Sequence, residues 1–188
     1  MKNYDYQKQL HAVWEKAVKL YSGGQRDAST YFSPEETAFL DSIGASAQEI
    51  YDFAEDYAGA GEPDFTSVAM MHDVRRSYFL EVQKGQMSNR MIDMNTLPAK
   101  DAEVEGIRWL PRIIPKAKVK LRGELDPDLM YGCGGDRNFF KEHDIHPAEF
   151  LRLVWANEDN EQAVIAWVAR RSKTAAQESP ETGEACTL

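Results

Sequence analysis

The feature that most constrains this chain is a dense series of helix start and stop signals. Two stretches, SPEE at residues 33–36 and SAQE at residues 46–49, have the serine and glutamate spacing of a capping box, in which each side chain bonds the other residue's backbone. Glycines 23, 44 and 123 follow apolar residues at helical spacing, and glycine commonly ends a helix. The pattern predicts an all-α fold of about eight helices, over residues 5–21, 34–43, 47–57, 68–84, 111–122, 137–143, 147–154 and 160–172.

The composition excludes several functions. The chain has 188 residues, 43% of them hydrophobic, and a net charge of −9. Affinity for nucleic acid or anionic lipid comes mainly from clustered lysine and arginine, so we expect neither a nucleic-acid nor a membrane partner. No apolar run approaches the roughly 20 residues of a membrane helix, and the first residues lack the apolar region of a signal peptide. Two cysteines, Cys133 and Cys186, make no disulfide framework, so a cytoplasmic location is expected.

The chain also shows a faint internal repeat. At a spacing of one hundred positions, a lysine, a glycine, a tyrosine and a glutamate recur, as Lys16 and Lys116, Gly23 and Gly123, Tyr31 and Tyr131, and Glu49 and Glu149. The matches fall on helix caps, stops and core positions, which favours an ancient duplication over chance. We therefore expect two weakly similar four-helix halves packed on one core, with Phe139 and Phe150 buried in the second half, and Phe39 and Ile50 as their counterparts.

The repeat divides the chain into four parts. The first helical half takes residues 1–84, a linker takes 85–106, the second half takes 107–173, and a polar tail of low apolar content, predicted to be disordered, takes 174–188. One short helical turn is predicted in the linker at residues 89–94. Any ligand site is expected at the seam between the halves, where concave surface tends to form.

Three stretches of the second half carry a family resemblance. WLPRIIPKAKVKLRGEL, MYGCGGD and HDIHPAEFL, within residues 106–172, resemble the bacterial domain-of-unknown-function family numbered 5069. The resemblance implies a bacterial, soluble, helical protein. It implies no activity and no catalytic residues.

Four residues of the second half could carry chemistry. Cys133, Asp136, His143 and His146 are of types that ligate zinc, although their spacing is against a metal site and His146 also suits the cap before Pro147. Cys133 lies just before a helix, where a thiol can be activated, and His143 is a possible base. The alternative is a structural cysteine in a tight glycine turn, with Asp136 as the helix N-cap.

Other polar residues suggest binding rather than catalysis. Arg170 and Arg171 recur, as Arg75 and Arg76 do, near the predicted end of a helix, where cations complement the helix dipole or could clamp an anionic ligand. Trp109 and Arg112 flank a helix start and are ligand-binding candidates.

No strong catalytic constellation or cofactor motif is present. The sequence therefore favours a cytosolic, all-helical binding or interaction protein without catalysis or cofactor, acting on an unknown small molecule or protein. The alternative is a small enzyme that uses Cys133 and His143, or the metal site above.

Overall fold

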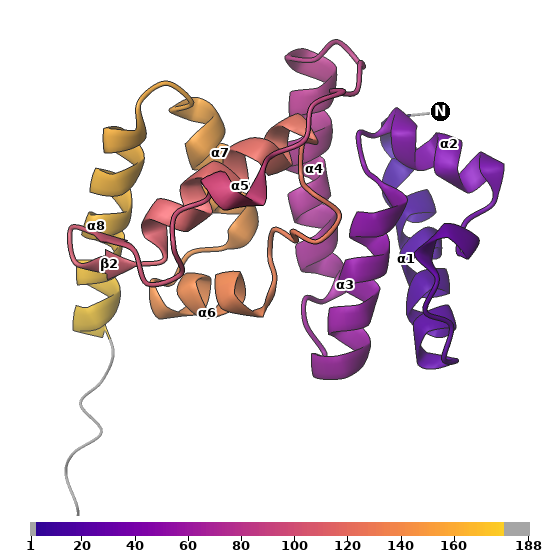
Figure 1. The fold of residues 1–188 in the computed structure, drawn as a ribbon, viewed down its shortest axis with the longest axis horizontal. Coiled ribbons are helices and arrows are strands. Elements are labelled where there is room, and N and C mark those ends of the chain that lie inside the picture. The colour runs from indigo at the N-terminus through magenta and orange to yellow at the C-terminus, as the bar shows by residue number, and fades with distance from the viewer. Residues whose placement is uncertain (1–2, 179–188) are drawn as a thin grey trace, which may run out of the picture.

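The regular secondary structure of the chain is almost entirely α-helical. The computed structural model describes residues 3–178, and the last ten residues of the predicted tail, with Cys186, lie outside them. Within the described part are eight α-helices (Figure 1), which confirms the all-α prediction: α1 (Tyr6–Ser22), α2 (Pro34–Ser42), α3 (Ala47–Ala60), α4 (Phe65–Glu81), α5 (Leu110–Arg122), α6 (Gly134–Glu142), α7 (Pro147–Ala156) and α8 (Glu161–Glu178). Three short 3-10 helices, η1 (Asn3–Asp5), η2 (Ala28–Thr30) and η3 (Met94–Thr96), complete the helical set. No helix in the described range is long and apolar enough to cross a membrane.

The predicted caps begin the helices as expected. Ser33 and Ser46 each close a capping box, with Glu36 and Glu49 respectively. His146 does the same for α7 with Glu149, so its interpretation as a capping residue is confirmed. Each cap satisfies backbone N–H groups that have no partner inside the helix.

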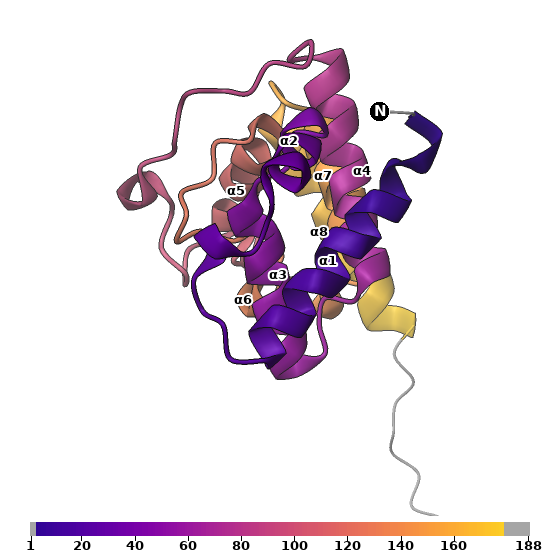
Figure 2. The same cartoon turned by 90° about the vertical axis from the view of Figure 1, so that its right-hand side faces the viewer.

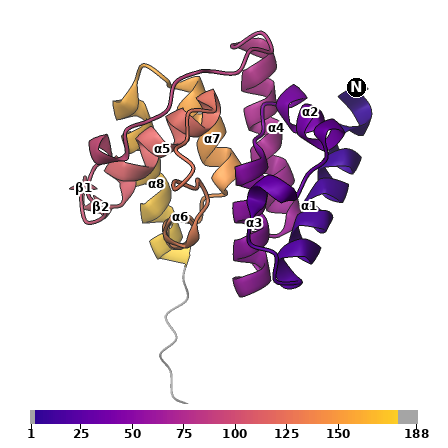
Figure 3. The same cartoon turned by 45° about the vertical axis from the view of Figure 1, so that its right-hand side comes forward.

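The buried apolar side chains form two clusters, and those of α4 belong to the cluster of the second half. One cluster joins α1, α2 and α3; the other joins α4 to α5, α6, α7 and α8, with Trp14 and Phe53 contributed from α1 and α3. Figure 3 shows α4 with α1–α3 on one side and α5–α8 on the other. Although α4 precedes the linker in sequence, its apolar face packs mainly against the second half, and the arrangement as two four-helix halves stays a prediction.

The core predictions hold in most positions. Phe139 is 3% exposed, and Phe150 and Ile50 are fully buried. Phe39 is only partly buried and packs at the edge of the first cluster.

The linker carries more structure than predicted, and at other residues. The turn expected at residues 89–94 is wrong in position, because the 3-10 helix begins at Met94. A small antiparallel hairpin of β1 (Glu103–Val104) and β2 (Ile107–Arg108) follows, which no periodicity revealed because each strand has two residues. Figure 2 shows the connection from α4 running along the outside of the helices, where Ile92 N–H donates to the Glu124 carbonyl at 2.9 Å.

Helix α8 is longer than predicted. It was expected to end near residue 172, with the tail disordered from residue 174, but it continues to Glu178. The prediction that paired arginines sit at helix ends is therefore wrong: neither α4 nor α8 has a basic residue in its last turn. Both pairs lie within their helices, so the helix dipole does not explain them.

A candidate binding cleft between distant segments

The start of α6 is organised around a buried ion pair. The Lys116 ammonium lies 2.6 Å from Asp136 Oδ2, with side chains 2% and 0% exposed. The same carboxylate accepts the Gly132 N–H at 2.9 Å and, through Oδ1, the Trp109 indole N–H at 2.9 Å. Cys133, not Asp136, occupies the N-cap position, which corrects the prediction. Asp136 pairs with Lys116 and does not cap the helix, because a buried ammonium without a counter-ion costs several kcal/mol, more than a missing helix cap.

Close packing explains one of the clustered glycines. A Cβ on Gly135 would lie 2.6 Å from the Trp109 ring. Trp109 therefore has a structural role, since its indole N–H binds Asp136 and its ring packs on Gly135. These two contacts do not support the predicted binding role. Trp109 and His143 do share the lining of a hollow of about 580 Å³ beside the hairpin.

The structure does not bring Cys133 and His143 together. They flank opposite ends of the nine-residue helix α6, which separates them by roughly 15 Å along its axis. The Cys133 thiol is partly buried and lies 3.5 Å from the Lys116 ammonium. His143 Nδ1 instead shares a 2.9 Å hydrogen bond with the Ser172 hydroxyl, and burial lowers the pKa of its imidazole. His143 therefore lies too far from the Cys133 thiol to act as its general base.

The metal candidates are also dispersed. Among residues 3–178, no three His, Cys, Asp or Glu side chains are grouped to hold a metal ion. Asp136 is committed to Lys116, and His146 Nδ1 accepts the Ala148 N–H at 3.1 Å.

The predicted arginines serve separate local contacts. Arg112 Nη1 donates to the Pro98 carbonyl at 2.7 Å, and Arg171 Nη2 lies 2.8 Å from Asp144 Oδ2. Arg170 is exposed, and Arg75 is fully buried. They form no common clamp for a ligand.

The structure shows instead a cleft between the α3–α4 connection and the α6–α7 corner. It encloses about 630 Å³, within the usual range of small-molecule sites. Residues 61–71 line one wall and residues 132–147 the other. Its lining includes the apolar residues Met71, Phe140, Ile145 and Pro147. We call it the interhelical cleft.

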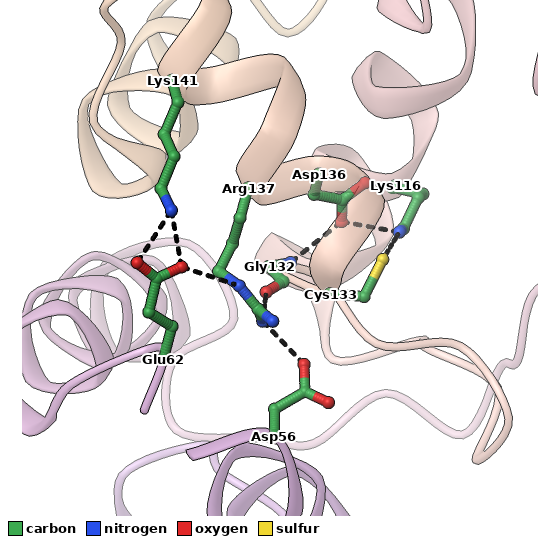
Figure 4. A network of polar contacts seen from close by, with 8 residues as sticks. All are labelled: Asp56, Glu62, Lys116, Gly132, Cys133, Asp136, Arg137 and Lys141. Atoms are coloured by element: carbon green, nitrogen blue, oxygen red, sulfur yellow. Dashed lines mark hydrogen bonds and ion pairs between the residues drawn. The ribbon is translucent and has the colours of Figure 1, made fainter. Parts of the chain in front are cut away.

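A chain of ion pairs ties the two walls together (Figure 4). Arg137 Nη1 lies 2.6 Å from Asp56 Oδ2 and donates to the Gly132 carbonyl at 2.8 Å. Arg137 Nε lies 3.6 Å from Glu62, which also binds Lys141 at 2.7 Å. Arg137 is only 14% exposed, so these contacts are worth more than ordinary surface pairs. Because the partners are about 80 positions apart, no sequence spacing signalled them.

His146 presents a hydrogen-bond donor at the cleft. Its Nδ1 accepts from the backbone, so the neutral ring carries its proton on Nε2. Burial is the main cause that lowers the pKa of His146, which keeps the ring neutral near pH 7. The lining of the cleft therefore combines apolar side chains, a neutral donor, and two cations that are already paired with carboxylates.

Comparison with known proteins finds a family match over the second part of the chain. Residues 94–182 match the family model described as Domain of unknown function (DUF5069), which confirms the resemblance expected from the sequence. The matched segment begins at η3 and includes α5, α6 and α7. No curated protein and no solved structure matches the chain.

Proposed function

We propose that the protein binds a small organic molecule in the interhelical cleft and performs no chemistry on it. The observation that carries this proposal is the cleft itself, which encloses about 630 Å³ between two segments, has apolar residues in its lining, and has walls joined by the Arg137 network. Sites of this kind are typically apolar with a few fixed polar groups.

The charges of the walls indicate the ligand class. Arg137 is neutralised by Asp56 and Glu62, and Lys141 by Glu62, so neither cation needs a ligand anion. The neutral side-chain donors that could orient a ligand include the His146 Nε2–H and the Ser67 hydroxyl, both of residues in the lining. We therefore infer an uncharged ligand with an apolar body and a carbonyl or hydroxyl oxygen.

The test uses Prodan, an uncharged fluorophore with an apolar naphthalene body and one carbonyl oxygen. We expect saturable one-to-one binding with a blue-shifted emission. Ser67→Trp fills the cleft and should weaken binding at least tenfold. Thr66→Trp places the same indole on the neighbouring exposed position, outside the lining, and should bind as the wild type does.

A second variant tests the orienting donor. His146→Ser keeps an N-cap acceptor but removes the Nε2–H, and should weaken Prodan binding by about three- to tenfold, as expected for one lost hydrogen bond. Equal binding by the wild type and Ser67→Trp contradicts the proposal.

The cellular setting is part of the same proposal. A net charge of −9 and the scarcity of cysteine support a cytoplasmic protein with no nucleic-acid or membrane partner. The family resemblance supports a bacterial source.

A further inference from the structure

Helix α6 borders two separate hollows with its opposite faces. Three of its residues line the interhelical cleft: Arg137, Phe140 and Lys141. Residues three or four positions apart on the other face line the hollow beside the hairpin: Gly135, Asn138, Phe139 and Glu142. Residues of the segment 100–109 form its second wall, and it encloses about 580 Å³, within the usual range of small-molecule sites. We call it the hairpin hollow.

The hairpin hollow lies wholly within the family match. All of its lining residues fall between positions 100 and 143, inside the matched segment 94–182. The interhelical cleft, by contrast, takes one wall from residues 61–71, outside that segment.

His143, at the end of this face of α6, offers a hydrogen-bond acceptor. The Ser172 hydroxyl lies 2.8 Å from the Val168 carbonyl oxygen and 2.9 Å from His143 Nδ1. A hydroxyl has one proton and a carbonyl oxygen only accepts, so both contacts are hydrogen bonds only when Nδ1 carries the ring proton. Nε2 is then an acceptor, and no group within residues 3–174 donates to it. His143 is 8% exposed, and burial lowers its pKa, so the ring is neutral near pH 7.

The buried part of the lining is aromatic and apolar. Phe139 and Ile107 are 3% and 7% exposed, and the Phe139 and His143 rings meet edge to face at 4.7 Å. The Trp109 ring packs on Gly135, which lies eight residues before His143 and therefore about 12 Å from it along the helix axis. The hollow thus offers aromatic surface along α6 and an acceptor at one end.

The charges of the lining favour a neutral ligand. Lys100 and Arg108 are balanced in number by Asp101 and Glu142, and all four are exposed. Exposed charges of both signs give no net attraction for an anion or a cation.

We propose that the hairpin hollow binds a neutral phenol, whose aromatic ring packs against Trp109 and Phe139 and whose hydroxyl donates to His143 Nε2. Aromatic rings pair favourably in offset or edge-to-face contacts. The hydroxyl supplies the donor that the protein does not provide to this nearly buried nitrogen. The hollow therefore has the opposite polarity to the interhelical cleft, where the His146 ring is the donor.

The probe is 4-fluorophenol, which is neutral at pH 7, observed by ¹⁹F NMR with the full chain. Binding should saturate at one molecule per chain with a dissociation constant of about a millimolar, because the probe fills only part of the hollow. The matched compound is 4-fluoroanisole, in which a methyl group replaces the hydroxyl proton. It should bind the wild type about three- to tenfold more weakly, as expected for one lost hydrogen bond.

Two tryptophan variants locate the site. Asn138→Trp fills the hairpin hollow from an exposed position of α6 and should weaken 4-fluorophenol binding at least tenfold. Lys141→Trp is the matched control, because it places the same indole at an exposed position on the other face of the same helix, in the lining of the interhelical cleft. It should bind as the wild type does.

A third variant tests the acceptor. His143→Phe keeps a ring beside Phe139 but removes Nε2, so 4-fluorophenol and 4-fluoroanisole should bind it with the same weak affinity. If this variant fails to fold, the two probes on the wild type decide, and equal affinities overturn the acceptor role. Binding that survives in Asn138→Trp overturns the assignment to the hairpin hollow, and its simultaneous loss in Lys141→Trp places the phenol in the interhelical cleft instead.

Discussion

A lysine–carboxylate ion pair occurs twice in the chain, at a spacing of one hundred positions, once partly exposed and once buried. Lys16 lies 2.6 Å from Glu36 with side chains 39% and 29% exposed; Lys116 lies 2.6 Å from Asp136 with side chains 2% and 0% exposed. Each pair joins the first helix of its segment to the second. In the first segment the carboxylate also closes a helix cap, and in the second it is surrounded by protein. The same type of ion pair therefore occurs at the surface, where it contributes little to stability, and in the core, where its loss is costly.

The difference comes from what covers each pair. The hairpin and Trp109 lie before α5, and the indole packs on Gly135 and donates to Asp136. No such segment precedes α1 among the residues described. Covering the pair removes water from both charges, so the second pair needs its additional hydrogen bonds from Gly132 and Trp109, and the first does not.

The turns after α2 and α6 are alike in detail. Ala45 N–H donates to the Leu40 carbonyl at 3.0 Å, and Ile145 N–H to that of Phe140 at 2.9 Å. Gly44 and Asp144 both have positive φ, at 70° and 50°. These parallels favour the duplication, which stays a prediction.

The largest expected effect comes from breaking the buried pair. Lys116→Met leaves a buried carboxylate without its cation and should lower the free energy of unfolding by about 3–5 kcal/mol. Lys16→Met should cost at most about 1 kcal/mol, because exposed pairs contribute little. Urea denaturation of both variants measures the contrast.

A double variant separates charge from volume. Lys116→Met with Asp136→Leu removes both charges and should recover part of the lost stability. Equal losses in Lys116→Met and Lys16→Met contradict the assigned difference in burial.

The second comparison concerns Phe139 and Phe39. Phe139→Ala should cost about 3–4 kcal/mol, because its ring packs on Phe140 and Phe150 with 3% of the residue exposed. Phe39 is only partly buried, so Phe39→Ala should cost about half as much. Thermal unfolding of the two variants provides the test. An unchanged stability of Phe139→Ala would contradict the buried position of Phe139 in α6.

These contrasts show how far the sequence could be read. Caps at Ser33 and Ser46 and the stop at Gly123 were predictable, because each depends on residues within one turn. The role of Asp136 was not predictable, because its partner Lys116 lies 20 positions away. The carboxylate binds this ammonium and does not cap α6. The interhelical cleft could not be located from the sequence, because Arg137 meets Asp56 and Glu62 through tertiary packing alone. Arg75 appeared as half of a repeated arginine pair, and nothing in its neighbours signalled burial.

A smaller effect is expected at Asp52, which lies one hundred positions before the exposed Arg152. Burial raises the pKa of Asp52 to about 6. Between about pH 4 and pH 6 the Asp52 carboxyl is ionised in the unfolded chain but still largely protonated in the folded protein. Its contribution to the free energy of unfolding therefore becomes less favourable as pH rises, and the loss is complete above about pH 6. Asp52→Asn should therefore stabilise the protein by about 1–2 kcal/mol at pH 7.5 and by little at pH 4.5. Asp41→Asn, at an exposed position, is the control, and an unchanged difference between the two pH values contradicts the assignment.

The smallest expected effect distinguishes the two equivalent caps, Ser46 and His146. Replacing either by alanine should cost about 1 kcal/mol at pH 8, since each loses a cap of the following helix. Only the histidine cap depends on pH, because protonation of Nδ1 removes the acceptor that binds the Ala148 N–H. Burial lowers the pKa of His146 below 6.5, so its contribution is complete above that pH and is lost as pH falls through the folded pKa. The cost of His146→Ala should thus shrink between pH 8 and pH 5, while that of Ser46→Ala stays constant. His146→Ser should restore the cap and abolish the pH dependence; a cost of His146→Ala that does not vary with pH means that the ring does not cap α7 through Nδ1.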